Sequence, residues 1–256
     1  MQASWQNLAL LNTTPVKVEA AGKAVHGTGF FVWWQEKEGA ALFLVSNKHV
    51  LLSEESSVSV LVHQRSDKES GWFIGDGETR LWIDPHNHKE VKLPVKGRYF
   101  AHPDVDLACI ECTEFNLRKD TILAPFSQDR ILDWKRSELY PGQQVLFFGY
   151  PDKIKDQLHN LPVVRTATLA SLPVLDYNGK PEFLIDGQVW KGSSGSPVFV
   201  ATPDGNSAFS LIGIIHSQLY KGADQDTHLG LGLAVKSSSL VDLLGGAWRS
   251  LTNTDN

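Results

Sequence analysis

Residues 190–200 read WKGSSGSPVFV, a glycine- and serine-rich turn that runs directly into an apolar, β-branched segment. Gly192 and Gly195 flank Ser194, and glycine permits a tight turn that brings backbone groups close to a ligand. The run PVFV that follows is typical of a strand on a half-buried sheet. The stretch therefore predicts a serine hydroxyl presented at the entrance to a strand.

Two other segments place a histidine and a carboxylate at comparable positions. Residues 44–52 read LVSNKHVLL, so that His49 follows an apolar, strand-like run. Residues 102–110 read HPDVDLACI, where Asp106 opens another apolar run. Asp104 is the alternative carboxylate, but it follows a proline and fits a turn better than a strand end.

These residue types suit nucleophilic catalysis at a carbonyl carbon. A serine hydroxyl attacks only when a base takes its proton, and histidine titrates in the range that this requires. A fixed carboxylate holds the imidazole in one tautomer and stabilises its protonated form. Ser194, His49 and Asp106 are therefore the candidates for these three roles. The backbone N–H groups of Gly192 and Ser194 are predicted to form an oxyanion hole.

Short strand-like runs separated by turn residues dominate the rest of the chain. Their enrichment in Val, Ile, Phe and Trp predicts an all-β protein. One helix is expected at 237–244 (SSSLVDLL), ended by Gly245 and Gly246. The predicted strands are 16–19, 30–34, 41–45, 58–63, 107–111, 145–149, 164–169, 182–185, 197–201, 209–215 and 229–235.

Four motifs together resemble the trypsin-like serine peptidases, and most closely their compact bacterial members without disulfides. The motifs are GTGFFV (27–32), NKHV (47–50), DLA (106–108) and GSSGSP (192–197). Two positions depart from the family pattern. Ser193 stands where zymogen-activated trypsins carry an aspartate, and Ser196 replaces the second glycine of G-x-S-G-G-P. We therefore expect no regulation by the salt bridge of those trypsins.

The resemblance implies a chymotrypsin-like fold of two antiparallel six-stranded β-barrels with a C-terminal helix and the active site between the barrels. Residues 1–120 would form the N-terminal barrel, which carries His49 and Asp106. Residues 121–256 would supply a connector, the C-terminal barrel with Ser194 and the specificity pocket, and the terminal helix.

The resemblance also places the primary specificity pocket beside the nucleophile. The implied substrate-binding residues are Gln188, Val189, Ile215, His216 and Ser217. No carboxylate occupies the base position, which argues against a strict Lys/Arg preference, although Asp224 and Asp226 could reach in from the following loop. His216 is expected either near Asp106 or directed to solvent.

Composition and charge exclude several function classes. The 256 residues carry a formal net charge of −5, so the sequence does not show the excess of basic residues that is typical of nucleic-acid-binding proteins. No apolar run is long enough to cross a membrane. No convincing secretory signal is present, and Cys109 and Cys112 are expected to be free and buried, as in a reducing compartment. A cytoplasmic protein is therefore expected.

A histidine-rich stretch raises the question of a metal. Residues 84–89 read DPHNHK and offer Asp84, His86 and His88. Beyond the two histidines, no strong ligand stands at a spacing typical of a metal site. A solvated loop is expected there, and neither a metal nor a cofactor is predicted.

The predicted function is that of a serine endopeptidase that hydrolyses peptide bonds through an acyl-enzyme, with a protein or peptide as substrate. The alternative from another class is an inactive, protease-fold module that binds peptides or proteins. A third, contextual possibility is a bacterial defence protease that cleaves one dedicated partner protein.

Overall fold

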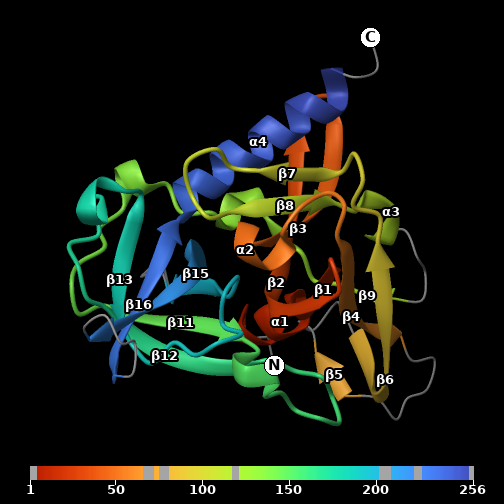
Figure 1. Ribbon diagram of the computed structural model, residues 1–256, viewed down its shortest axis with the longest axis horizontal. Helices are drawn as coiled ribbons and strands as arrows, with labels where there is room; N and C mark the ends of the chain where they lie inside the picture. The colour runs from red at the N-terminus through yellow and green to blue at the C-terminus, as the bar shows by residue number, and fades with distance from the viewer. Residues whose placement is uncertain are drawn as a thin grey trace.

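The computed structural model describes residues 5–65, 72–74, 81–116, 121–201, 209–221 and 227–253. Within them two β-structures lie side by side, and one long helix crosses the first of them (Figure 1). The expected all-β class with a C-terminal helix is confirmed.

The second half closes into a six-stranded antiparallel barrel, as expected, with the order β11-β12-β13-β16-β15-β14. Its strands are β11 (Gln144–Gly149), β12 (Val163–Leu169), β13 (Glu182–Asp186), β14 (Pro197–Ala201), β15 (Phe209–Lys221) and β16 (Thr227–Lys236).

The first half forms a ten-stranded sheet, where six strands were expected. Its main path is β5-β6-β4-β1-β2-β3-β8-β7, while β9 pairs with β4 and β10 pairs in parallel with β2. The added strands satisfy backbone groups that would otherwise stay unpaired at the edges. The strands are β1 (Thr13–Ala20), β2 (Lys23–Glu36), β3 (Gly39–Ser46), β4 (Ser57–Arg65), β5 (Trp72–Ile74), β6 (Leu81–Leu93), β7 (Tyr99–Ala101), β8 (Ala108–Glu111), β9 (Thr121–Ile122) and β10 (Phe126–Ser127).

Helices are few within the described residues. The α-helices are α1 (Trp5–Asn12), α2 (Lys48–Leu51), α3 (Thr113–Asn116) and α4 (Ser237–Asn253), and the short 3₁₀ turns are η1 (Gln128–Arg130), η2 (Trp134–Arg136), η3 (Pro151–Lys153) and η4 (Tyr177–Gly179). In the part of the chain that the structure describes, none of them has the length and apolar character that a membrane span requires.

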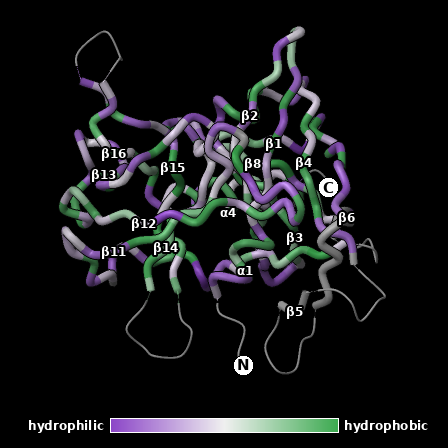
Figure 2. Tube along the Cα trace, turned by 90° about the horizontal axis from the view of Figure 1, so that it is seen from below, coloured by the Kyte–Doolittle hydropathy of each residue, from purple (hydrophilic) through white to green (hydrophobic). Residues whose placement is uncertain are grey.

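Clusters of buried side chains hold the two halves and join them. Because successive residues of a strand point to opposite faces, Phe31 packs inside the first sheet while Phe30 packs toward the second half. The cluster between the halves also takes in α1 through Trp5 and α4 through Leu240. Figure 2 shows hydrophobic stretches along α4 and neighbouring strands in the middle of the molecule. The two halves are therefore fixed against each other by a shared core.

The C-terminal helix continues past the two glycines that were expected to end it. It runs to Asn253, because Ala247 is buried and Trp248 and Leu251 pack against the core between the halves. A Cβ on Gly245 would lie 3.7 Å from Trp34, at ordinary contact distance. Tertiary packing thus outweighs the cost of two glycines, about 1 kcal/mol each.

The two cysteines are free and buried, as expected. Cys109 belongs to the core between the halves, whereas Cys112 packs inside the first sheet. Burial raises the pKa of both thiols, so both stay protonated and unreactive at neutral pH.

Candidate active site

His49 and Asp106 form a direct pair at the edge of the first sheet. His49 Nδ1 lies 2.5 Å from Asp106 Oδ2, and the His49 backbone N–H donates to Asp106 Oδ1 over 3.1 Å. Two contacts from one carboxylate fix both the position and the ring orientation of the histidine. In the part of the chain that the structure describes, no hydrogen bond joins Asp104 to His49, and the Asp104 N–H donates to His102 Nδ1 in a turn. The choice of Asp106 over Asp104 agrees with this geometry.

A buried asparagine ties the two segments together. Asn47 precedes α2, its Nδ2 donates to the carbonyl of Asp106 over 2.7 Å, and its own carbonyl accepts the N–H groups of Val50 and Leu51. The short helix that carries His49 is therefore attached to the loop that carries Asp106 by backbone as well as side chain.

The carboxylate of Asp106 is held in its charged form. Burial is the largest single influence and pushes its pKa upward, but the hydrogen bonds from His49 and the charge of that histidine together hold the pKa of Asp106 below its usual value. An ionised carboxylate on Nδ1 leaves Nε2 as the nitrogen that can accept a proton. His49, held by Asp106, can thus act as a base through Nε2.

The loop of Ser194 has a backbone that only glycines permit. Gly192 has φ +91° and Gly195 has φ +88°, a region that other residues rarely adopt. A Cβ at Gly195 would collide with the carbonyl of Thr28, and a Cβ at Gly192 would lie 2.6 Å from the carbonyl of Tyr150. The glycines predicted to shape this turn are required by space as well as by φ.

Thr28, which is fully buried, fastens this loop to the first sheet. Its N–H donates to the carbonyl of Ser194 over 2.8 Å, and its Oγ1 donates to the carbonyl of Gly192 over 2.9 Å. The same Oγ1 accepts the N–H of Tyr150 over 3.0 Å, and the Thr28 carbonyl accepts Ser46 Oγ over 2.7 Å. The residue joins three segments that are far apart in sequence. Its place between two glycines in GTGFF was the only available signal, and its role was not predicted.

The backbone N–H groups of Gly192 and Ser194 are available to a ligand. Neither has a hydrogen-bond partner among the described residues. The preceding peptide is fixed because the Lys191 carbonyl accepts the N–H of Asp152 over 2.6 Å. Two unpaired N–H groups two residues apart on a fixed loop can bind one developing negative charge.

The hydroxyl of Ser194 faces the second barrel. Its Oγ donates to the carbonyl of His216 over 3.4 Å, and within the described residues no hydrogen bond joins it to His49. The two segments nevertheless meet at Gly27, where a Cβ would lie 2.7 Å from Val50, the neighbour of His49, and 3.2 Å from the carbonyl of Ser194. The structure thus brings His49 and Asp106 into contact and places the Ser194 backbone near the helix that carries His49.

The predicted pocket residues divide into two groups. Ile215 and Val189 are buried in the barrel core, and Val189 contacts Gly232 of β16. Gln188 is exposed beside them, and Ser217 and His216 are half-buried on β15. Asp224 and Asp226 lie outside the described residues.

His216 points into the protein, toward Glu182, a neighbour that the sequence did not predict. Its Nε2 lies 3.4 Å from Glu182 Oε1, and the two side chains keep only 15% and 10% of their surface exposed. Burial lowers the pKa of His216, although the charges of Glu182 and Asp106 act in the opposite direction. A histidine whose backbone carbonyl accepts the Ser194 hydroxyl is thus directed into the protein toward Glu182.

Ser196, one of the departures from the family pattern, is accommodated by a glycine across the loop. Its buried Oγ has no hydrogen-bond partner among the described residues, and a Cβ on Gly149 would collide with it. Ser193 is also buried, with an unpartnered Oγ.

No group of three or more potential metal ligands occurs among the residues that the structure describes. His88 lies opposite His63 on neighbouring strands. The side chains of Asp84 and His86 lie outside the described residues.

Comparisons with known proteins agree with this architecture. The family model of the trypsin-like peptidase domain matches residues 27–213. A serine endoprotease from Yersinia pestis superimposes with a TM-score of 0.55 at 14% identity, over 97% of this chain and 68% of that one. The Rv3671c protease of M. tuberculosis in its inactive form gives 0.50 at 16% identity, over 93% and 90%.

An inactivated protease paralogue of the scabies mite gives a TM-score of 0.53 at 13% identity, over 95% of this chain and 96% of that one. A search of the curated proteins finds no match. At these identities the structural neighbours establish the chymotrypsin-like fold, and the family model, which spans most of the chain, establishes the family. The chain belongs to the trypsin-like peptidase domain family.

Proposed function

We propose that the protein is a serine endopeptidase in which Ser194 is the nucleophile, His49 the general base and Asp106 the residue that orients it. The observation that carries the proposal is the double contact of Asp106 with His49, beside a loop whose N–H groups at Gly192 and Ser194 are unpaired. In the proposed arrangement a base, its orienting group and an anion-binding site act on one hydroxyl.

In the proposed reaction, His49 Nε2 takes the proton of Ser194 Oγ as this oxygen attacks the carbonyl carbon of the scissile bond. The N–H groups of Gly192 and Ser194 bind the resulting oxyanion. His49 then gives its proton to the leaving nitrogen, and the C–N bond breaks to leave an acyl-enzyme. Water, deprotonated by His49, hydrolyses the ester and restores Ser194.

The serine must turn for this reaction, since its hydroxyl donates to the carbonyl of His216. Rotation about its Cα–Cβ bond moves Oγ away from that carbonyl without disturbing the backbone that Thr28 and Ile215 hold. Catalytic hydrogen bonds in free enzymes are commonly long and tighten when substrate binds. We propose that substrate binding selects the rotamer that faces His49.

The same contact favours one rival function, a peptide-binding module that keeps the fold without hydrolysis. A serine held permanently on the His216 carbonyl would leave the groove intact and the nucleophile inactive. The two functions differ in one observable, which is whether Ser194 reacts.

Cleavage profiling with a diverse peptide library, with Ser194→Ala as the blank, tests the proposal. We expect products that are absent from the blank, with a preference for uncharged residues before the scissile bond, because Gln188 and Val189 supply no carboxylate. Equal product profiles for both proteins would contradict it and favour the binding module.

We also propose a restricted protein substrate and a reducing, cytoplasmic setting. The buried free thiols of Cys109 and Cys112 support the setting, since neither depends on a disulfide.

A further inference from the structure

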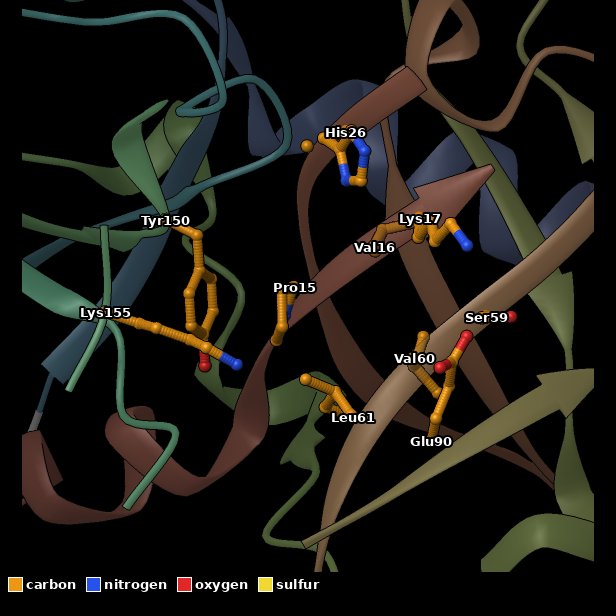
Figure 3. A pocket seen from close by; sticks show the side chains of 11 residues that line it. Pro15, Val16, Lys17, His26, Ser59, Val60, Leu61, Glu90, Tyr150 and Lys155 are labelled. Atoms are coloured by element: carbon orange, nitrogen blue, oxygen red, sulfur yellow. The ribbon is translucent and has the colours of Figure 1, made fainter. Parts of the chain in front are cut away.

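Some hollows of the protein adjoin the candidate active site and others lie apart from it. A cavity of about 190 Å³ between β1, β4 and Tyr150 belongs to that site, because Gly27 lines it and a Cβ on Gly27 would lie 3.2 Å from the carbonyl of Ser194 (Figure 3). An open groove of about 590 Å³ lies elsewhere, between β7 and α4, which run beside each other in Figure 1. No candidate catalytic residue lines this β7–α4 groove, so a molecule that fills it need not contact them.

The outer edge of β7 carries backbone groups without partners. β7 is the last strand on the main path of the first sheet, where it pairs with β8. The Arg98 carbonyl and the His102 N–H are bonded to the opposite segment, each over 2.9 Å. Because hydrogen-bonded positions alternate along an antiparallel pair, Phe100 also faces β8, whereas the N–H and C=O groups of Tyr99 and Ala101 face away from it. Within the described residues these four groups have no hydrogen-bond partner.

The lining of the β7–α4 groove is apolar where it is buried and acidic where it is exposed. Leu243 and Ala247 of α4 are buried, and Phe100 packs against the same core. Asp104 and Asp242 line the groove and are exposed, and among the described residues neither has an ion-pair partner. No lysine or arginine is among the lining residues. The groove therefore offers main-chain hydrogen bonds, an apolar surface and two uncompensated negative charges.

Gly246 keeps the helix side of the groove open. It lines the groove, and a Cβ at this position would meet no atom within 4 Å. A strand added to the free edge of β7 would lie about 4.8 Å from it and would run along the groove. An extended chain is also the form of ligand that can bond to the N–H and C=O groups of Tyr99 and Ala101 together.

The charges of the groove indicate which extended chain fits. Lysine or arginine side chains would give Asp104 and Asp242 the ion pairs that the described residues do not supply. A second copy of this chain fits poorly, because a twofold contact would set the same two carboxylates of each copy in one interface. The net charge of −5 adds to that repulsion. The occupant is therefore a segment of a different protein.

We propose that the β7–α4 groove binds an extended, basic segment of a partner protein, which adds a strand to β7 and pairs its Lys or Arg side chains with Asp104 and Asp242. The bound segment contacts residues 102–104, which lead directly to Asp106. The inference goes beyond the proposed hydrolysis and holds whether or not Ser194 reacts.

The test measures binding of fluorescein-labelled heptapeptides to the full-length Ser194→Ala protein by fluorescence anisotropy, so that no probe is cut. We expect KTVTVTK to bind about five- to tenfold more tightly than ETVTVTE at low ionic strength, and the difference to shrink at about 1 M salt. Methylating the amide nitrogens of alternate residues removes the donors of one edge of the peptide. One alternate set should weaken binding by about tenfold or more, while the other set stays within about twofold.

Amide hydrogen exchange, followed by NMR, locates the bound strand on β7. The Tyr99 and Ala101 amides should exchange more slowly when KTVTVTK is bound, because a strand at this edge covers both. The Phe100 amide, which faces β8 in the free protein, should change less.

Variants of α4 connect the binding to the groove. Gly246→Trp fills it and should weaken binding by about tenfold or more, whereas Gly246→Ala leaves it open and should bind within about twofold of the parent. Both replace a glycine in a helix and have space for a Cβ, so both should fold. Val241→Trp, at an exposed position of α4 outside the groove, is the control for a large side chain and should bind normally. Asp104→Asn combined with Asp242→Asn should abolish the difference between the two peptides.

Several results would overturn this inference. They are absence of saturable binding, equal binding of the two peptides, equal effects of the two methylated sets, and undiminished binding by Gly246→Trp. Dimerisation of the peptide-free protein that Gly246→Trp abolishes, measured by analytical ultracentrifugation, would assign the groove to a second copy and overturn it as well. Because the nucleophile is absent from every protein in this test, none of these results bears on the proposed endopeptidase, which the peptide-library cleavage tests separately.

Discussion

Replacing Thr28 by valine removes one hydroxyl and retains the shape of the side chain. In the structure that hydroxyl donates to the carbonyl of Gly192 and accepts the N–H of Tyr150, and all three residues are buried. Each buried group left without a partner costs about 1–3 kcal/mol, so Thr28→Val should lower the free energy of unfolding by about 2–6 kcal/mol. This is a large part of the roughly 5–15 kcal/mol that a folded domain has in total.

Thr28→Ser is the matched control, because it keeps the hydroxyl and loses only a methyl group, at a cost of about 1 kcal/mol. Urea unfolding of both variants, followed by tryptophan fluorescence, gives the two free energies. The Gly192 carbonyl belongs to the loop that we propose binds the oxyanion, so kcat on an anilide should fall in Thr28→Val by up to about 10²-fold, with a smaller change in KM. A Thr28→Val protein as stable and as active as Thr28→Ser would refute this account of the loop.

Three other predictions follow from the structure. Asp106→Asn should lower kcat by about 10⁴-fold, the loss known for this triad position, while Asp104→Asn stays near the wild type, as steady-state kinetics on one anilide would show. Gly149→Ala should destabilise the protein because its Cβ meets Ser196 Oγ, and adding Ser196→Ala should restore much of the loss in a thermal or urea denaturation cycle; additive effects would contradict the contact. Burial lowers the pKa of His63 from 6.5 to about 4, so the unfolded chain binds a proton at this position before the folded protein does as the pH falls. The free energy of unfolding should therefore drop by about 3 kcal/mol between pH 6.5 and 4. A His63→Gln variant whose free energy of unfolding falls equally steeply with pH would contradict this.

The candidate site was largely predictable because its chemistry lies in short motifs. His49 lies on the short helix that follows β3, Asp106 stands just before β8 and Ser194 just before β14. The glycines around Ser194 are required by the backbone they adopt. What joins these segments was not predictable in the same way. Thr28 acts through bonds to residues more than 120 positions away, which no local pattern reveals.

The fold shows the same division. Alternating apolar residues predicted the strands, and their burial on the two faces of β2 explains why. The parallel pairing of β10 with β2 depends on packing between distant segments, and so does the continuation of α4 past Gly245. The cavity beside Tyr150 likewise exists only where β1 and β4 meet the second half.

The most direct test of the central claim is covalent labelling of the native protein with a fluorophosphonate, followed by peptide mapping. The account predicts one phosphonyl group per chain, on Ser194 Oγ, with labelling slowed by orders of magnitude in His49→Ala although the fold is retained. Labelling of another serine, or no labelling of a folded wild-type protein, would contradict the assignment of Ser194 as an activated nucleophile.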